Sequence, residues 1–110
     1  MQNKINIPEY SVSKFNKLFR DIIESNFNYL RIRGEISEIK KATKGQIYLT
    51  LKDDNSIISG VIWDNKKEYL KFEPKLGLEV IVTGKITTWS RYKTTYQIDI
   101  DQLEIAGEGV

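Results

Sequence analysis

Hydrophobic and polar residues alternate along two neighbouring stretches in the first half of the chain, residues 29–39 and 46–52. The apolar residues of each stretch share one parity: Leu30, Ile32 and Ile36, then Ile47, Leu49 and Leu51. A period of two is typical of β-strands that bury one face and expose the other. We therefore predict two strands with one exposed face each. The exposed faces carry Arg31, Arg33, Tyr48 and Lys52.

Three further strands are predicted at residues 57–63, 78–89 and 95–105. The last two alternate between apolar and polar positions, whereas 57–63 is apolar on both parities and is expected to be covered on both sides. Trp63, at the end of that run, is expected in the core, as large aromatic residues usually are. A short helix is predicted between the third and fourth strands, at 64–72, where polar residues can cap its start.

Near the N-terminus, residues 10–26 carry apolar residues with helical spacing. The positions i, i+3, i+4, i+7 and i+8 are Phe15, Leu18, Phe19, Ile22 and Ile23. This spacing places them on one stripe of an α-helix, and we expect the stripe to pack in the core. Either Ser11 or Ser13 can act as the N-cap. With Ser11 as the cap, Tyr10 and Phe15 are placed to form a hydrophobic staple.

The predicted order is helix, three strands, short helix, two strands. Five strands with a helix between the third and fourth is the order of the OB-fold, a mainly β, partly open Greek-key barrel. Gly34, Gly60 and Gly84 lie inside predicted strands, where a glycine often marks a bulge or bend. Bends at these positions suit a small, curled sheet.

A chain of 110 residues suits one domain with its own core. We assign residues 1–9 to an N-terminal arm, 10–105 to the OB-fold domain with its helix at 10–26, and 106–110 to the start of a linker. The polar N-terminus lacks a long apolar run, so we expect neither a secretory signal nor a membrane span.

The chain contains no cysteine and no histidine. Disulfides, thiolate or imidazole metal sites and nucleophile–histidine catalysis are therefore excluded within it. Asp53 and Asp54 form a carboxylate pair, but their surroundings are typical of a turn. Asp99 and Asp101 would share one strand face and could hold a divalent cation, although a solvated strand face explains them equally simply. We assign no catalytic, metal or cofactor residue to this segment.

The net charge is only +2, so a nucleic-acid hypothesis depends on where the charges lie. Basic and aromatic residues gather in the loop K-K-A-T-K-G, on the strand that follows it, and in the loop W-S-R-Y-K. In an OB-fold these loops flank the face on which oligonucleotides lie. Lysines can contact phosphates, and aromatic rings can stack on bases. The candidate nucleic-acid-binding residues are Lys40, Lys41, Lys44, Tyr48, Lys52, Trp89, Arg91, Tyr92 and Lys93.

Structural explanations compete with this hypothesis. The loop lysines could simply keep the surface soluble. Tyr48 could cover a neighbouring strand, and Trp89 could plug one end of the barrel. Arg31 and Arg33 could pair with Glu35 or Glu79.

Several motifs in order resemble the N-terminal region of the large subunit of bacterial exodeoxyribonuclease VII. They are Y-S-V-S-K-F-N-K-L-F, then I-R-G-E-I-S, K-G-Q-I-Y-L-T-L-K-D, V-I-W-D, G-L-E-V-I-V-T-G-K-I, Y-Q-I-D-I and A-G-E-G, and they span Tyr10 to Val110. Gln46 stands where the family usually has a histidine. The loop 89–93 is assigned on physical grounds alone.

The resemblance implies an OB-fold that binds single-stranded DNA, within a cytoplasmic nuclease that degrades single-stranded DNA from either end to oligonucleotides. It also implies a catalytic domain beyond this segment, with small helical subunits attached to later parts of the large chain. Cofactors of the whole enzyme stay unknown at this point. Two alternatives remain open: an RNA- or tRNA-binding OB-fold, and a protein-interaction scaffold that uses exposed strand residues such as Thr50, Ile81 and Thr83.

Overall fold

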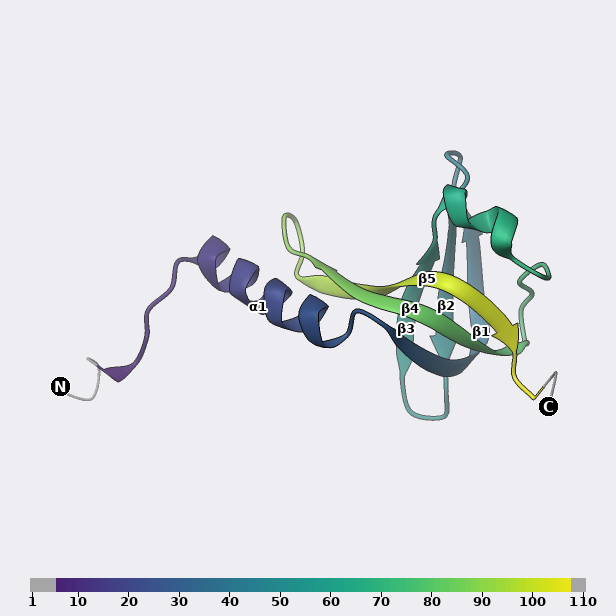
Figure 1. Cartoon of the computed structure of the whole chain (residues 1–110), viewed down its shortest axis with the longest axis horizontal. Coiled ribbons are helices and arrows are strands. Elements are labelled where there is room, and N and C mark those ends of the chain that lie inside the picture. Colours follow the sequence, from purple (N-terminus) through teal and green to yellow (C-terminus); the bar gives the residue numbers. More distant parts are fainter. Residues whose placement is uncertain (1–5, 108–110) are drawn as a thin grey trace.

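A computed structural model describes residues 6–107 of the chain (Figure 1). It contains one α-helix, one 3₁₀-helix and five strands within this range. Their bounds are α1 Val12–Asn26, β1 Leu30–Lys41, β2 Ile47–Lys52, β3 Ile57–Ile62, η2 Asp64–Tyr69, β4 Glu79–Trp89 and β5 Thr95–Ile105. The element order matches the prediction, with the short helix of the 3₁₀ type. The proposed linker lies mostly outside the described residues, as do the first five residues of the arm.

The five strands form one closed barrel in the order β1-β2-β3-β5-β4. All neighbouring strands are antiparallel except β3 and β5, which run parallel. That parallel contact is short, because it joins only Gly60 to Ile98 and Val61 to Asp99. The predicted OB-fold is confirmed, and its barrel closes through these two residue pairs.

Strand β1 belongs to both halves of the barrel. Its first half pairs with β4, from Leu30 opposite Gly84 to Glu35 opposite Glu79. From Glu35 onward it pairs with β2. The register shifts between Ile36 and Glu38, so the bulge lies just after Gly34 and not at it.

Of the three glycines predicted to mark bends, only Gly84 coincides with a shift in register, next to Thr83 in β4. A Cβ atom at Gly84 would lie 1.9 Å from the carbonyl oxygen of Asp99, so the two backbones pass too closely for any side chain. Gly60 lies in a regular register, and a Cβ there would press on Ile100. Gly84 therefore bends the barrel, whereas Gly60 allows close packing.

The core lies inside the barrel and consists of branched aliphatic side chains. Its fully buried members are Ile36, Leu51, Ile62, Val80, Val82, Ile98 and Ile100. Strand β3 is buried on both faces from Gly60 to Ile62, but Ile57 is 69% exposed, so the predicted cover on both sides holds only for the second half of the strand. Trp63 was expected in this core, and that prediction is wrong. It follows the end of β3 as the N-cap residue of η2, and it remains 39% exposed.

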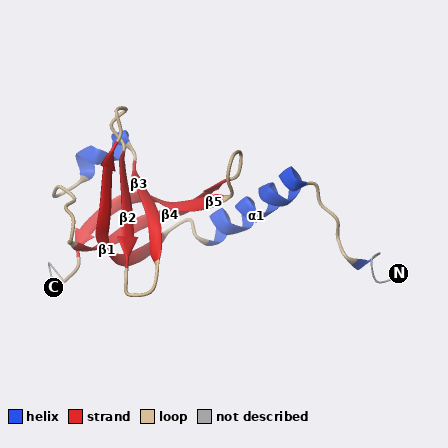
Figure 2. Cartoon of the chain, turned by 180° about the vertical axis from the view of Figure 1, so that it is seen from behind, coloured by secondary structure: helices blue, strands red, loops and turns tan. Residues whose placement is uncertain are grey.

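The prediction that the apolar stripe of α1 packs in the core is also wrong. The helix itself forms as expected: Ser11 accepts a hydrogen bond from the N–H of Lys14, and the rings of Tyr10 and Phe15 lie 5.8 Å apart. However, α1 projects away from the barrel (Figures 1 and 2) and none of its residues is buried. The stripe residues Phe15, Leu18, Phe19 and Ile22 are 40% to 51% exposed. Only the C-terminal end of α1 reaches the barrel, where Ile23 packs against the core.

That end of α1 covers an edge of β4. Pairing between β1 and β4 stops at Gly84. Beyond it, the N–H groups on that edge of β4 have no partner on β1. The N–H of Ile86 donates to the carbonyl oxygen of Phe27 at 2.8 Å, and the N–H of Thr88 donates to the carboxylate of Glu24 at 3.3 Å. Beyond Gly84, the end of α1 and the residue after it therefore replace β1 as the hydrogen-bonding neighbour of β4, on the part of β4 that leads to the β4–β5 loop.

Candidate nucleic-acid interface

A groove of about 210 Å³ lies across the exposed face of β2 and β3, between the two loops singled out from the sequence. Three of the candidate residues line it: Lys40, Tyr48 and Trp89. The remaining lining residues are Glu38, Leu49, Thr50, Ser59, Gly60 and Gln97. Residues from all five strands thus meet at one shallow site.

Strand register explains why these side chains converge. Lys40 on β1 lies opposite Tyr48 on β2, and Tyr48 lies opposite Val61 on β3. Alternate residues of a strand point to the same face, so Thr50 follows Tyr48 into the groove. Trp89 comes from the end of β4. The parity argument from the sequence therefore placed Tyr48 correctly on the exposed face.

Hydrogen bonds hold the polar members of the groove. The amide nitrogen of Gln46 donates to the hydroxyl of Tyr48 at 3.2 Å, which helps to hold the candidate stacking ring in place. The hydroxyl of Thr50 donates to the carboxylate of Glu38 at 3.0 Å. Tyr48 and Trp89 keep 37% and 42% of their surface exposed, which leaves ring surface available to a ligand.

The lysines of the first loop do not all lie where the sequence suggested. Lys40 and Lys41 were predicted in the loop, but both belong to β1, and only Lys44 lies in the turn. Because neighbouring strand residues point to opposite faces, Lys41 points away from the groove. Its ammonium lies 3.5 Å from the carboxylate of Glu73.

The turn that carries Lys44 depends on Gly45. This glycine has φ = 100°, and a Cβ there would lie 2.3 Å from a carboxylate oxygen of Asp64. The turn and the start of η2 are therefore packed closely together. Lys44 has no ion pair within residues 6–107.

The loop between β4 and β5 carries Arg91, Tyr92 and Lys93 beyond Trp89. Tyr92 is 88% exposed, and the guanidinium of Arg91 lies 5.2 Å from the centre of its ring. None of the three lines the groove. Lys52 lies on the same face of β2 as Tyr48, at the opposite end of the strand.

Arg31 and Arg33 do not contribute free positive charge. Arg33 pairs with Glu79 at 2.5 Å, one of the two partners suggested by the sequence, and Arg31 pairs with Glu104 at 2.7 Å. Both pairs join β1 to the β4–β5 side of the barrel, and none of these residues lines the groove.

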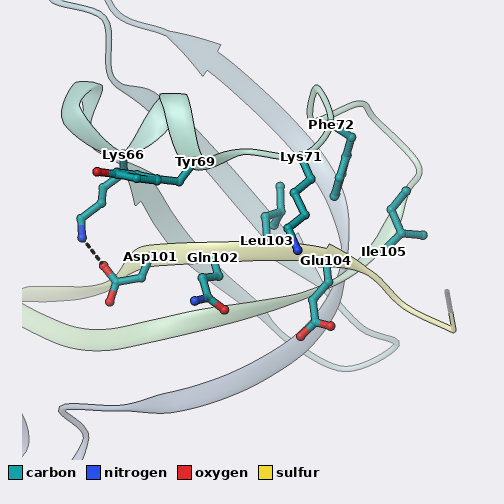
Figure 3. Close-up of a pocket in the computed structure, with 9 residues that line it drawn as sticks. All are labelled: Lys66, Tyr69, Lys71, Phe72, Asp101, Gln102, Leu103, Glu104 and Ile105. Carbon is teal, nitrogen blue, oxygen red and sulfur yellow. Dashed lines mark ion pairs between the residues drawn. The ribbon is translucent and has the colours of Figure 1, made fainter. Parts of the chain in front are cut away.

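A larger cleft of about 990 Å³ lies elsewhere, between η2, the segment after it and the end of β5 (Figure 3). Lys66 and Asp101 form an ion pair of 3.1 Å across it. It contains none of the nine candidate residues. Its size therefore does not identify it as the nucleic-acid site.

Three of the four carboxylates considered for catalysis or metal binding have other partners. Asp53 accepts hydrogen bonds from the N–H groups of Asn55 and Ser56 at 2.9 Å, which confirms the predicted turn. Asp99 accepts a hydrogen bond from Thr87, and Asp101 pairs with Lys66. Across residues 6–107, no three metal-ligating side chains gather at one point, and no helix is long and apolar enough to span a membrane.

Sequence reasoning missed the groove residues that are neither basic nor aromatic. Glu38, Ser59 and Gln97 line the groove, although nothing in their residue types marks them. Parity alone could have identified Ser59, because it lies opposite Thr50 across the β2–β3 ladder. Glu38 could be placed on the groove face only with knowledge of the bulge after Ile36, because the bulge changes the parity of β1.

Comparison with known proteins identifies the family of this chain. Residues 10–104 match the family of OB-fold nucleic acid binding domains. Among curated relatives, the exodeoxyribonuclease 7 large subunits of Erythrobacter litoralis and Caulobacter vibrioides are 43% and 45% identical over 104 residues. The alignments cover 94% of this chain but only 22% and 20% of the relatives. The resemblance inferred from the motifs is thereby confirmed.

Solved structures show the same fold at low sequence identity. Asparaginyl-tRNA synthetase from Pyrococcus horikoshii aligns with a TM-score of 0.59 at 19% identity, covering 78% of this chain and 22% of the synthetase. A replication protein A heterotrimer bound to ssDNA aligns with a TM-score of 0.57 at 13% identity, covering 71% of this chain and 57% of that one. At these identities the likeness concerns the fold alone.

Proposed function

The chain belongs to the family of OB-fold nucleic acid binding domains, and on that premise we propose that it is the single-stranded-DNA-binding module of a bacterial exodeoxyribonuclease VII large subunit. In this proposal the parent enzyme degrades single-stranded DNA from both ends to oligonucleotides in the cytoplasm. The module holds the strand and delivers it to a catalytic domain elsewhere in the parent chain. The small subunits of the enzyme bind other parts of the large subunit.

One observation carries the proposal: Tyr48 on β2 and Trp89 at the end of β4 line one groove together with Lys40, and both rings remain partly exposed. Bases can stack on exposed aromatic rings whatever their sequence, and each stack contributes about 1–3 kcal/mol. Lys40 carries no ion pair within residues 6–107, so its charge is available to a phosphate. A groove of this kind suits a single strand, whose bases are accessible.

The remaining candidate residues lie outside the lining of the groove. Lys44 lies in the turn before β2, and Lys52 lies at the far end of β2. Arg91, Tyr92 and Lys93 form the tip of the β4–β5 loop. In the proposal the lysines and Arg91 contact phosphates, and Tyr92 adds a third stacking ring. Lys41 contributes only to the overall positive electrostatic potential of the surface, because its side chain faces Glu73.

The test is fluorescence anisotropy of a labelled single strand of about 20 nucleotides, titrated with residues 1–110 at low and moderate salt. A duplex of the same sequence and a matched RNA are measured beside it. We expect the single strand to bind more tightly than the duplex, with an affinity that falls steeply as salt rises.

Each alternative predicts a different outcome of the same titration. Tighter binding of the RNA than of the matched DNA would support an RNA-binding module. No binding of any nucleic acid at low salt would contradict the proposal and favour a protein-interaction role. The strand residues first considered for that role include Thr83, which is 4% exposed and so cannot contact a partner.

A further inference from the structure

Glu38 is an acidic residue in a groove for which we propose a polyanionic ligand, and this contrast needs an explanation. Its side chain lines the groove together with Lys40, Tyr48 and Trp89. Glu38 is exposed and has no ion pair within residues 6–107, so no cation of the described chain neutralises it. A carboxylate repels phosphates, because both are negatively charged. Glu38 therefore suits a contact with a part of the nucleotide other than the phosphate.

A hydrogen bond orients the carboxylate of Glu38 and leaves it able to accept others. The hydroxyl of Thr50 donates to Oε1 of Glu38 at 3.0 Å. The two residues lie opposite each other across the β1–β2 ladder, and Ser59 lies opposite Thr50 on β3. All three line the groove. A carboxylate has about four lone-pair sites, so Glu38 can still accept hydrogen bonds from a ligand.

The candidate stacking ring lies in the neighbouring row of the sheet. Tyr48 lies opposite Lys40, and these two residues are each two positions along their strands from Thr50 and Glu38. Residues two apart on one face of a strand are separated by about 7 Å. A nucleobase that stacks on Tyr48 can therefore turn an edge toward Glu38 while its phosphate lies nearer to Lys40. This arrangement gives the phosphate and the edge of the nucleobase different partners in the groove.

We propose that Glu38 accepts hydrogen bonds from the edges of nucleobases and favours bases with an exocyclic amino group, namely cytosine, adenine and guanine, over thymine. The inference rests on the proposed function, because it concerns the ligand of the same groove. The exocyclic amino group of cytosine donates hydrogen bonds, and a carboxylate accepts them. Thymine has a carbonyl oxygen at that position, and its ring N–H lies between two carbonyl oxygens that repel a carboxylate. One negatively charged acceptor thus distinguishes bases of nearly equal size.

The test compares labelled oligomers of deoxycytidine and of deoxyuridine, each about 20 nucleotides long, titrated with residues 1–110 in fluorescence anisotropy. The two bases differ in the amino or carbonyl group and in the proton on the ring nitrogen beside it, and neither carries the methyl group of thymine. A slightly alkaline buffer keeps cytosine unprotonated and its oligomer single-stranded. We expect the deoxycytidine oligomer to bind about fivefold more tightly or better, as for one weak discriminating contact to a base.

Two variants test whether Glu38 is the discriminating residue. Glu38→Gln replaces one acceptor oxygen with an amide donor, so it should bring the ratio of the two affinities close to one. Glu35→Gln is the matched control: Glu35 is another exposed acid of β1 without an ion pair in the described part of the chain, but it does not line the groove. Each variant removes one negative charge and should bind both oligomers more tightly. Only Glu38→Gln should change the ratio.

The outcomes separate this inference from the proposed function. If neither oligomer binds at low salt, the proposed function is contradicted and the inference falls with it. If both oligomers bind with equal affinity, the inference alone is overturned and the proposed function stands. A preference for deoxycytidine that persists in Glu38→Gln also overturns the inference, because another group of the groove then distinguishes the bases.

Discussion

The carboxylate of Glu24, near the end of α1, accepts a hydrogen bond from the backbone N–H of Thr88, 3.3 Å away and one residue before Trp89. This contact occupies a β4 edge group that β1 does not reach. It connects the protruding helix to the strand end that carries a groove ring. The C-terminal end of α1 therefore helps to fix the position of the end of β4.

We predict that Glu24→Ala will weaken single-stranded DNA binding by about two- to tenfold, the equivalent of one net hydrogen bond. Amide exchange at Thr88 should accelerate in the same variant, because its N–H loses its acceptor. Glu24→Gln retains an acceptor oxygen and should largely restore both properties. Unchanged affinity in Glu24→Ala would mean that Trp89 is positioned without the helix.

Trp89→Ala should weaken binding of the single strand by about 1–3 kcal/mol, the typical loss for one stacked base. Its stability should change little, since the ring is 42% exposed. Tyr69→Ala is a matched control, because Tyr69 is also an exposed ring but lies in the other cleft (Figure 3). Anisotropy titrations of both variants provide the comparison. Equal losses in the two would indicate a non-specific effect of removing aromatic surface.

Lys40 and Lys41 are adjacent in sequence and face opposite sides of β1, which makes them a natural pair for comparison. Lys40→Gln should lower the slope of log affinity against log salt by about 0.7, the value for one phosphate contact on a single strand. Lys41→Gln should leave the slope nearly unchanged, because this side chain faces Glu73. If both variants lower the salt slope by the same amount, the bound DNA also passes the face of β1 that carries Lys41.

Removing Arg31 and Arg33 together should have little effect on DNA binding, since both pair with acids outside the groove. The double variant Arg31→Gln, Arg33→Gln should lose at most about 1 kcal/mol of unfolding free energy per pair, as exposed ion pairs usually do. Urea unfolding measures the free energy of unfolding, and salt-dependent anisotropy measures DNA binding. A salt slope as reduced as that of Lys40→Gln would place DNA on the β1–β4 face instead.

Gly84→Ala should destabilise the fold severely, because its Cβ would lie 1.9 Å from the carbonyl oxygen of Asp99 and a backbone must move to admit it. We expect a loss of at least about 3 kcal/mol, in the range of the most disruptive single substitutions. Gly77→Ala is the control: its φ is 87°, but no atom lies within 4 Å of the added Cβ. It should cost only the backbone strain, about 1–2 kcal/mol. Comparable urea midpoints for the two variants would contradict the close approach at Gly84.

The strands and the exposed face of the site could be predicted from the sequence because their signals are local. A period of two identifies a strand and assigns its residues to faces without reference to the rest of the chain. Tyr48 and Lys52 were placed on the exposed face of β2 in this way, and the structure agrees. Trp89 was recognised by residue type and by its place next to a loop.

What failed in the prediction required knowledge of non-local contacts. The bulge after Ile36 changes the parity of β1, so Lys40 enters the groove and Lys41 leaves it. The sequence shows two lysines side by side and contains no local signal for the shift. In the same way, Trp63 looks like a core residue until the end of β3 and the start of η2 are known.

The amino-acid sequence by itself determined the order of elements, the OB-fold and the exposed face of β2, because alternation, caps and turn residues act over a few positions. Only the tertiary structure decided where α1 lies, which arginines are neutralised and which lysine faces the groove. An apolar stripe indicates that a helix face favours burial, but it does not specify which surface covers that face. That depends on the three-dimensional arrangement, and in α1 it leaves Phe15, Leu18, Phe19 and Ile22 exposed.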